Sequence, residues 1–206
     1  MQKPNNYAET SAGGNFPKID LGGHKMIVKQ ISEKKTASGK DMLVVLVDTD
    51  TTDKQPHFFM DMFNNDHRQD KKYPNQATEY IVTTDNEGNC SCKLKGFCEA
   101  LEQSNAGFSC WNKDDTFNFA GCKGKKIGAV FGEELDYYNG EEKKKRVIRW
   151  FCDVNKALDA EIPEISQSQA YKEYKNSPAS ALPDANASVQ DFMNLPDIDD
   201  TELPFN

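Results

Sequence analysis

The chain of 206 residues is 37% hydrophobic, 28% charged and 10% aromatic. This composition is typical of one soluble domain and contains few apolar residues for two separate hydrophobic cores. No stretch approaches the roughly 18 consecutive apolar residues that a membrane span requires. The polar stretch Met1–Phe16 has neither the basic start nor the apolar run of a secretory signal, so we expect a cytoplasmic protein. In the cytosol the six cysteines are expected to stay reduced, without a disulfide framework.

Charge is distributed unevenly along the chain. Of the formal net charge of -8, residues 1–155 contribute -1 and residues 156–206 contribute -7. From Ile165 onward the sequence is dominated by Ser, Ala, Asn, Gln, Pro and Asp, with too few aliphatic residues to offset the entropy of ordering. We therefore expect a folded domain over residues 1–165, a flexible linker over 166–196 and an acidic tip over 197–206.

Three segments in the first third of the chain are predicted to be strands. His24–Ser32 and Asp41–Asp48 are apolar runs separated by a polar loop that contains Gly39, the pattern of a hairpin with a longer loop. His57–Phe63 alternates, with Phe58, Met60 and Met62 on one face. This alternation predicts a third strand.

A helix is predicted in the middle of the chain. Leu94, Phe97, Cys98 and Leu101 fall at the i, i+3, i+4 and i+7 positions of one helix face. Ser91 is a suitable N-cap, and Gly107 is a suitable stop beyond the helix end. The 63 residues from Asn64 to Lys126 are long for one connection, and Thr78–Thr84 is a candidate extra strand within them.

Two further strands, Ile127–Leu135 and Arg146–Val154, flank a segment whose Asn139-Gly140 pair is a hairpin turn signal. Five strands with one helix between the third and the fourth is the element order of the OB-fold. The predicted fold is therefore all-β dominated, a five-stranded OB-fold barrel with one short helix and an acidic C-terminal tail.

An OB-fold binds its ligand on strands 2 and 3, together with the loop between strands 1 and 2 and the loop between strands 4 and 5. The candidate ligand-binding residues of this chain lie in these places. Both loops are rich in cations, and single-strand binders combine cations for phosphates with aromatic faces for bases. The cationic candidates are Lys34, Lys35, Lys40, Lys143, Lys144, Lys145 and Arg149. The aromatic candidates are Phe59, Phe63, Tyr137, Tyr138 and Phe151, whereas alternation along the last strand assigns Trp150 to the core.

The C-terminal sequence Asp197-Ile-Asp-Asp-Thr-Glu-Leu-Pro-Phe-Asn206 resembles the acidic tip of bacterial and bacteriophage single-stranded DNA-binding proteins. Asp199, Asp200 and Glu202 match the acids of that tip, and Leu203, Pro204 and Phe205 match its hydrophobic end. The resemblance implies an OB-fold body that binds single-stranded DNA, and a tip that recruits replication, recombination or repair proteins. Asn206 departs from the pattern, because the family tip usually ends at Phe.

Other functions stay open at this point. Cys90, Cys92, Cys98, Cys110 and Cys122 lack the C-x2-C spacing of a zinc knuckle, so we expect free thiols and no metal or other cofactor. His57, Asp61, Asp66, His67 and Asp70 could ligate a nuclease metal, but no motif fixes them, and we expect no enzymatic activity. An OB-fold can also bind RNA or protein, and the sequence does not decide the oligomeric state.

Overall fold

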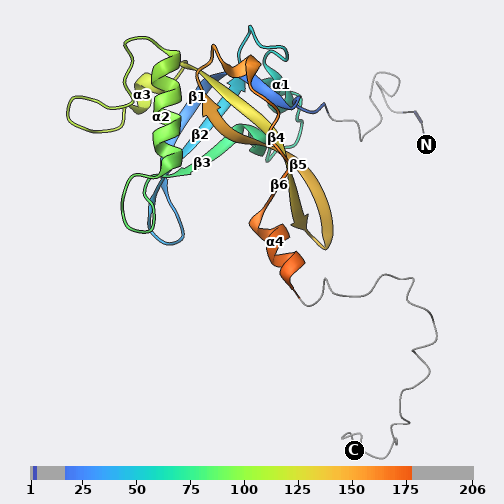
Figure 1. Cartoon of the computed structure of the whole chain (residues 1–206). Helices are drawn as coiled ribbons and strands as arrows, with labels where there is room; N and C mark the ends of the chain where they lie inside the picture. Colours follow the sequence, from blue (N-terminus) through green and yellow to red (C-terminus); the bar gives the residue numbers. More distant parts are fainter. Residues whose placement is uncertain (1, 4–16, 178–206) are drawn as a thin grey trace, which may run out of the picture.

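The computed structural model describes residues 2–3 and 17–177, and it is dominated by one sheet (Figure 1). The strands are β1 (Gly22–Lys35), β2 (Asp41–Thr49), β3 (Thr78–Val82), β4 (Lys126–Tyr138), β5 (Glu141–Cys152) and β6 (Ser166–Gln167). Their order is β3-β2-β1-β4-β5 with antiparallel neighbours, and β6 pairs in parallel with β4. Within the described residues no hydrogen-bonded pairing joins β3 to β5, so the sheet is open.

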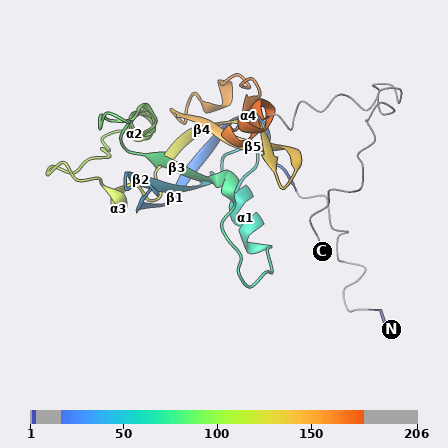
Figure 2. The same ribbon diagram turned by 90° about the horizontal axis from the view of Figure 1, so that it is seen from below.

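The helices are short and lie outside the sheet. They are α1 (Phe58–Asn64), α2 (Cys92–Ser104), α3 (Phe119–Cys122) and α4 (Gln169–Asn176), with 3-10 turns η1 (Asn75–Ala77) and η2 (Ala157–Asp159). Figure 2 shows α1 and α2 well apart from each other, and both bury side chains in the core. Among residues 17–177 no helix has the length and apolar character needed to cross a bilayer.

The core forms because inward-facing residues of β1, β2 and β4 alternate with outward-facing ones. Met26, Val28, Val45 and Val47 are buried on this inner face, and Phe131 joins them from β4. The apolar face of α2 closes the core with Leu94, Phe97 and Leu101, as the helical spacing predicts. Phe58 and Phe59 of α1 belong to the same core, which therefore lies between the inner face of the sheet and the two helices α1 and α2.

Four predictions about the middle of the chain are confirmed. The predicted helix is α2, and the side chain of Ser91 caps it by accepting a hydrogen bond from the Leu94 amide. The candidate extra strand within residues 64–126 is β3. Asn139 and Gly140 both have positive φ, 53° and 82°, as a tight turn between β4 and β5 requires.

The prediction of a strand at His57–Phe63 is wrong, because His57 is the N-cap of α1 and the residues that follow it form this helix. Asp48 Oδ1 accepts hydrogen bonds from the amides of Phe59 and Met60, and the Thr49 hydroxyl accepts one from Phe58. These acceptors satisfy the free amides of a helical first turn. Apolar residues on both faces of the segment made its period ambiguous. The third strand of the sheet is β3 instead.

The predicted faces of the last strand are also wrong beyond Ile148. Trp150 pairs with Val130 and Ile148 with Phe131, so Arg149 is an extra residue in a β-bulge. The bulge shifts the alternation by one residue. Phe151 therefore turns inward and contacts the Phe97 ring, whereas Trp150 turns outward and is 44% exposed.

After β5 the chain crosses the outer face of β1 and β4 as a strap, which we define as residues 153–164. Glycines line its path, because a Cβ on Gly23 would lie 1.5 Å from the Ala157 carbonyl oxygen. A Cβ on Gly128 or Gly132 would also lie under 3.0 Å from atoms of the strap. Ala157 is fully buried as a result. The missing side chains thus let a second layer of backbone lie directly on the sheet.

The predicted linker begins too early, since residues 166–176 form β6 and α4. Tyr174 stacks on Tyr137 with ring centroids 3.7 Å apart, and Lys175 pairs with Glu142 at 2.7 Å. Tyr171 is buried against the same hairpin and donates a hydrogen bond to Glu142. Residues 178–206, including the tip residues Asp199, Asp200, Glu202, Leu203, Pro204 and Phe205, lie outside the described part.

Candidate nucleic-acid interface

The loop between β1 and β2 carries the predicted cations Lys34, Lys35 and Lys40. Lys35 pairs with Asp41 at 2.5 Å, and this contact raises the pKa of Lys35. The Lys40 ammonium donates to the Asp85 carbonyl and the Asn86 amide oxygen, which are neutral acceptors. Lys34 is exposed, and no carboxylate in the described residues pairs with it. Two of the three cations therefore keep an uncompensated charge.

The hairpin of β4 and β5 is different, because its lysines are matched by acids. Residues 133–145 contain three lysines and five carboxylates. Lys145 contacts Glu134 and Asp136, both at 3.0 Å, while Lys143 pairs with Glu141 and Lys144 with Glu133. Arg149 donates to the Glu164 carbonyl of the strap. The lysines that sequence reasoning treated as a cationic run are therefore largely neutralised by neighbouring carboxylates.

The predicted aromatic residues fall into buried and exposed groups. Phe59 is fully buried and packs against Phe131, and Phe151 packs against Phe97, so neither presents a free face for a base. One face of Tyr137 is covered by Tyr174. Phe63 is half-buried beside Tyr73, with the Lys71 ammonium 4.6 Å from its ring centre, and Tyr138 is 63% exposed near the hairpin turn.

Sequence reasoning missed an exposed aromatic residue of this sheet, Tyr80 of β3, which is 49% exposed. Tyr80 pairs with Val44 of β2, and Val44 pairs with Ser32 of β1. The next cross-strand row on this outer face joins Val82, Met42 and Lys34, about 7 Å away along the strands. Tyr80 and Lys34 therefore share one surface. The alternation of faces within the predicted strand Thr78–Thr84 contained the signal, because Tyr80 and the buried Ile81 are neighbours in sequence and must point to opposite faces of the sheet.

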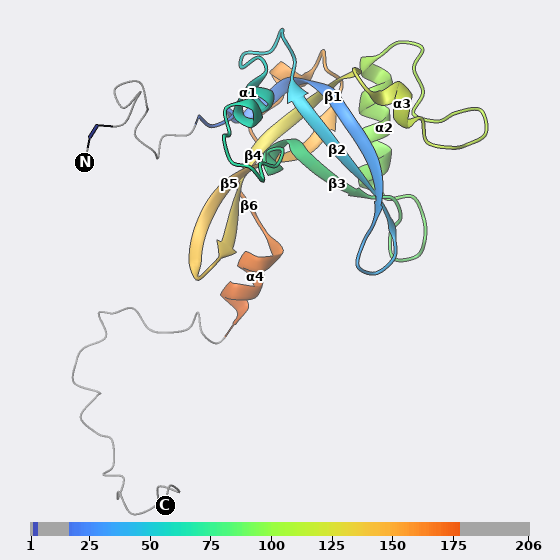
Figure 3. The ribbon, with the colours of Figure 1, turned by 180° about the vertical axis from the view of Figure 1, so that it is seen from behind.

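This outer face of β1, β2 and β3 lies between the two predicted loops. The loop between β1 and β2 follows the end of β1, whereas β4 runs antiparallel past Gly22, at the start of β1, before it turns into β5. The loop and the turn therefore lie beyond opposite ends of β1, and Figures 1 and 3 show them on opposite sides of the body. Lys93 of α2 borders the face, since it donates to the Tyr80 carbonyl and pairs with Glu79. Burial raises the pKa of Glu79, a shift that the contact with Lys93 opposes.

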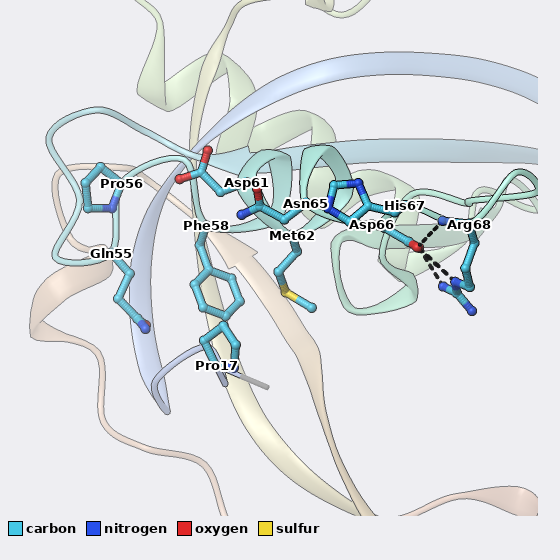
Figure 4. A pocket seen from close by; sticks show the side chains of 10 residues that line it. All are labelled: Pro17, Gln55, Pro56, Phe58, Asp61, Met62, Asn65, Asp66, His67 and Arg68. Atoms are coloured by element: carbon cyan, nitrogen blue, oxygen red, sulfur yellow. Dashed lines mark hydrogen bonds and ion pairs between the residues drawn. The ribbon is translucent and has the colours of Figure 1, made fainter. Parts of the chain in front are cut away.

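A pocket of about 890 Å³ lies beside α1, and three of the candidate nuclease residues line it (Figure 4). Phe58, Met62 and Pro17 form its apolar wall, and Asp61, Asp66 and His67 lie along its rim. Hydrogen bonds from Arg68 lower the pKa of Asp66 to about 2, so that carboxylate is already engaged. Across residues 17–177 no group of three or more His, Cys, Asp or Glu side chains is arranged to hold a metal ion.

All six cysteines are free thiols in the structure. Cys98, Cys110 and Cys122 are buried together, and the Cys110 thiol donates to the Cys98 carbonyl at 3.8 Å. Hydrogen bonds to Cys122 and Cys98, together with burial, raise the pKa of Cys110. Cys90 and Cys92 are exposed at the start of α2. The buried thiols are therefore part of the core packing.

Comparison with protein-family models and with curated protein sequences finds no match to this chain. The geometry of the interface therefore carries the functional argument.

Proposed function

We propose that the protein binds single-stranded DNA with little sequence preference and recruits replication, recombination or repair proteins through its acidic C-terminal tip. The observation that carries the proposal is the exposed Tyr80 on the outer face of β2 and β3, with Lys34 on the next row of the same face. A ring on which a base can stack and a cation for the adjoining phosphate are the two elements of sequence-independent binding.

The arrangement of the strands supports an OB-type barrel for this body. Helix α2 follows β3 and contacts β3, β4 and β5, so it lies across the opening between the two edge strands. Glu79 of β3 and Ile148 to Phe151 of β5 line one small cavity of about 110 Å³ beneath α2. The two edges thus approach one another as in a partly open barrel, whose ligand face is the outer surface of strands 2 and 3.

The test is a titration of labelled oligonucleotides followed by fluorescence anisotropy. Mixed-sequence and oligo-dT single strands are both expected to bind, with affinities within about tenfold of each other, and duplex DNA is expected to bind more weakly than either. Tyr80→Ala is expected to weaken single-strand binding about 5- to 150-fold, because one base–aromatic stack contributes about 1 to 3 kcal/mol. Tyr80→Phe keeps the ring and serves as the matched control. Equal affinity for duplex and single strand would refute the proposal.

Salt dependence separates the two groups of lysines. Lys34→Gln should flatten the log–log slope of affinity against salt concentration by about 0.7, the value for one phosphate contact on a single strand. Lys145→Gln should change the slope less, since Lys145 is already paired with Glu134 and Asp136. A larger change for Lys145 would move the phosphate path to the hairpin.

RNA is the second ligand that the same surface could accept, because a stacking ring does not read the sugar. Adding oligo-U to the titration decides between the two nucleic acids. Tighter binding of oligo-U than of oligo-dT would replace the DNA proposal with an RNA-binding one.

The tip has its own test, since it is expected to act outside the folded body. Asp199, Asp200 and Glu202 would steer encounter with a basic partner, and Phe205 would anchor in an apolar pocket. Truncation after Pro196 should leave thermal unfolding unchanged and abolish pull-down of replication or repair proteins. Phe205→Ala should abolish the pull-down while retaining the acidic charge. Retained capture by both variants would contradict the role of the tip.

A further inference from the structure

A third pocket, of about 580 Å³, lies at the end of the sheet where β1 and β2 meet their loop. One wall is a ladder of three aromatic rings. Trp111 and Phe117 pair across an isolated bridge and contact edge to face at 5.5 Å, and Phe119 follows at 5.0 Å from Phe117. Trp111 is 44% exposed, whereas Phe117 and Phe119 are packed against the core.

The aromatic arm, which we define as residues 110–119, is held in shape by its own hydrogen bonds. The Asn112 amide donates to the Thr116 carbonyl, and the Asn118 amide donates to the Cys110 carbonyl at the base of the arm. Figures 1 and 3 show the loop between α2 and α3 projecting from the body. The exposed ring of Trp111 is therefore held in place before any ligand arrives.

Two carboxylates line the same pocket as the aromatic rings. Glu33 of β1 and Asp41 of β2 both border it, together with the apolar side chains of Leu43 and Leu94. Asp41 is paired with Lys35, whereas the Glu33 carboxylate accepts no hydrogen bond within residues 17–177. Carboxylates repel phosphate and accept hydrogen bonds from amino groups. The pocket therefore favours a flat ring that carries an exocyclic amine.

The position of the pocket connects it to the proposed DNA path. Glu33 and Asp41 flank the loop that carries Lys34, Lys35 and Lys40. A strand whose phosphates lie on these lysines could turn one base into the pocket, while its backbone stays on the cationic side. A lysine or arginine side chain of a protein partner is the competing occupant, but it would meet these same lysines at the entrance.

We propose that this pocket is a base-binding subsite in which one unpaired cytosine, adenine or guanine stacks on Trp111 and donates a hydrogen bond from its exocyclic amine to Glu33. The inference rests on the proposed function and adds a preference to it, since thymine has no exocyclic amine. The subsite would make the protein favour amine-bearing bases modestly over thymine.

The test compares oligo-dC with oligo-dT on the full chain, using anisotropy and the emission of Trp111. The chain has two tryptophans, so Trp150→Phe isolates the Trp111 signal. Oligo-dC is expected to bind about 5-fold or more tightly than oligo-dT and to quench Trp111 saturably. Trp111→Ala should weaken oligo-dC binding about 5- to 150-fold, and Trp111→Phe should retain most of the wild-type affinity.

Glu33→Ala is the decisive variant, and the ratio of the two affinities is its readout. Removing any carboxylate raises affinity for every oligonucleotide, but only the loss of a base contact changes the ratio. Glu33→Ala should bring the ratio close to 1, and Glu87→Ala, which removes an exposed acid of the neighbouring loop, should leave it unchanged.

Three outcomes would overturn the inference. Equal binding of oligo-dC and oligo-dT, with no effect of Trp111→Ala, would refute the subsite and leave the proposed function intact. Saturable quenching of Trp111 by arginine amide and none by oligo-dC would assign the pocket to a cationic side chain. Failure to bind any single strand would refute the proposed function and the subsite together.

Discussion

The close packing of the strap on Gly23 makes a quantitative prediction. Gly23→Ala would place a Cβ 1.5 Å from the carbonyl oxygen of Ala157, where ordinary contact distances begin at 3.4 Å. Backbone atoms cannot rotate away as a side chain can, so the strap would have to move by about 2 Å. The close-packed interior around it does not absorb such a shift locally.

The expected cost follows from what the displacement exposes. Val154 and Ala157 are 7% and 0% exposed, and lifting the strap would return both to water. Exposing a buried Val costs about 1.5 to 3 kcal/mol, and overpacking strain adds about 1 to 3 kcal/mol. We expect Gly23→Ala to lower the free energy of unfolding by about 3 kcal/mol or more. For a domain of this size that is a fall in Tm of roughly 6 to 12 °C.

Thermal unfolding followed by circular dichroism measures the effect, and Gly96→Ala is the matched control. A Cβ on Gly96 meets nothing within 4 Å, and Ala is a better helix former than Gly by about 0.8 to 1.0 kcal/mol. Gly96→Ala should therefore raise the Tm by about 2 to 4 °C. A Gly23→Ala protein with an unchanged Tm would show that the strap does not lie on β1.

Three further predictions concern stability. Phe59→Ala should lower the free energy of unfolding in urea by about 3 to 5 kcal/mol, because Phe59 is fully buried; a loss of DNA affinity without a loss of stability would contradict this. Burial by itself would raise the pKa of Asp53, but hydrogen bonds from His24 and from backbone amides outweigh burial, so the pKa is lowered overall. The ionised Asp53 therefore stabilises the fold above about pH 4, and this contribution is lost as the pH falls. Asp53→Asn should lower stability at pH 7 and lose less of it between pH 5 and 3; identical pH profiles would refute the assignment. Truncation after Ile165 should expose Tyr137 and lower the Tm, whereas truncation after Ser177 should not, and equal Tm values would return residues 166–177 to the linker.

Local signals in the sequence predicted the elements that local chemistry determines. The Ser91 cap, the spacing of Leu94 and Leu101 and the Asn139-Gly140 turn each act within a few residues, and all three are present. The helical structure of α1 depends instead on Asp48, a residue outside the predicted segment, whose carboxylate caps it from β2. A tertiary contact of this kind leaves no local pattern.

The site was harder to predict, because the net charge and the exposure of a side chain depend on which residues the fold places next to it. The lysines of the hairpin read as a cationic run, yet their acids lie directly across the turn on β4. The bulge at Arg149 exchanged the roles of Trp150 and Phe151 by adding a single residue. Such a register shift reverses every face assignment beyond it, and no feature of the alternation announces where it occurs.

The pairing of β1 has a consequence for the order in which the chain can fold during synthesis. Gly22 pairs with Phe131, and Ala157 then covers Gly23, so the first strand finds its second neighbour only when residues about 100 positions later have been made. Until then one edge of β1 stays unpaired and able to pair with other chains. Contacts so distant in sequence slow folding, because a long loop must close before they form. The nascent chain is therefore most exposed to aggregation between the synthesis of β3 and the completion of the strap.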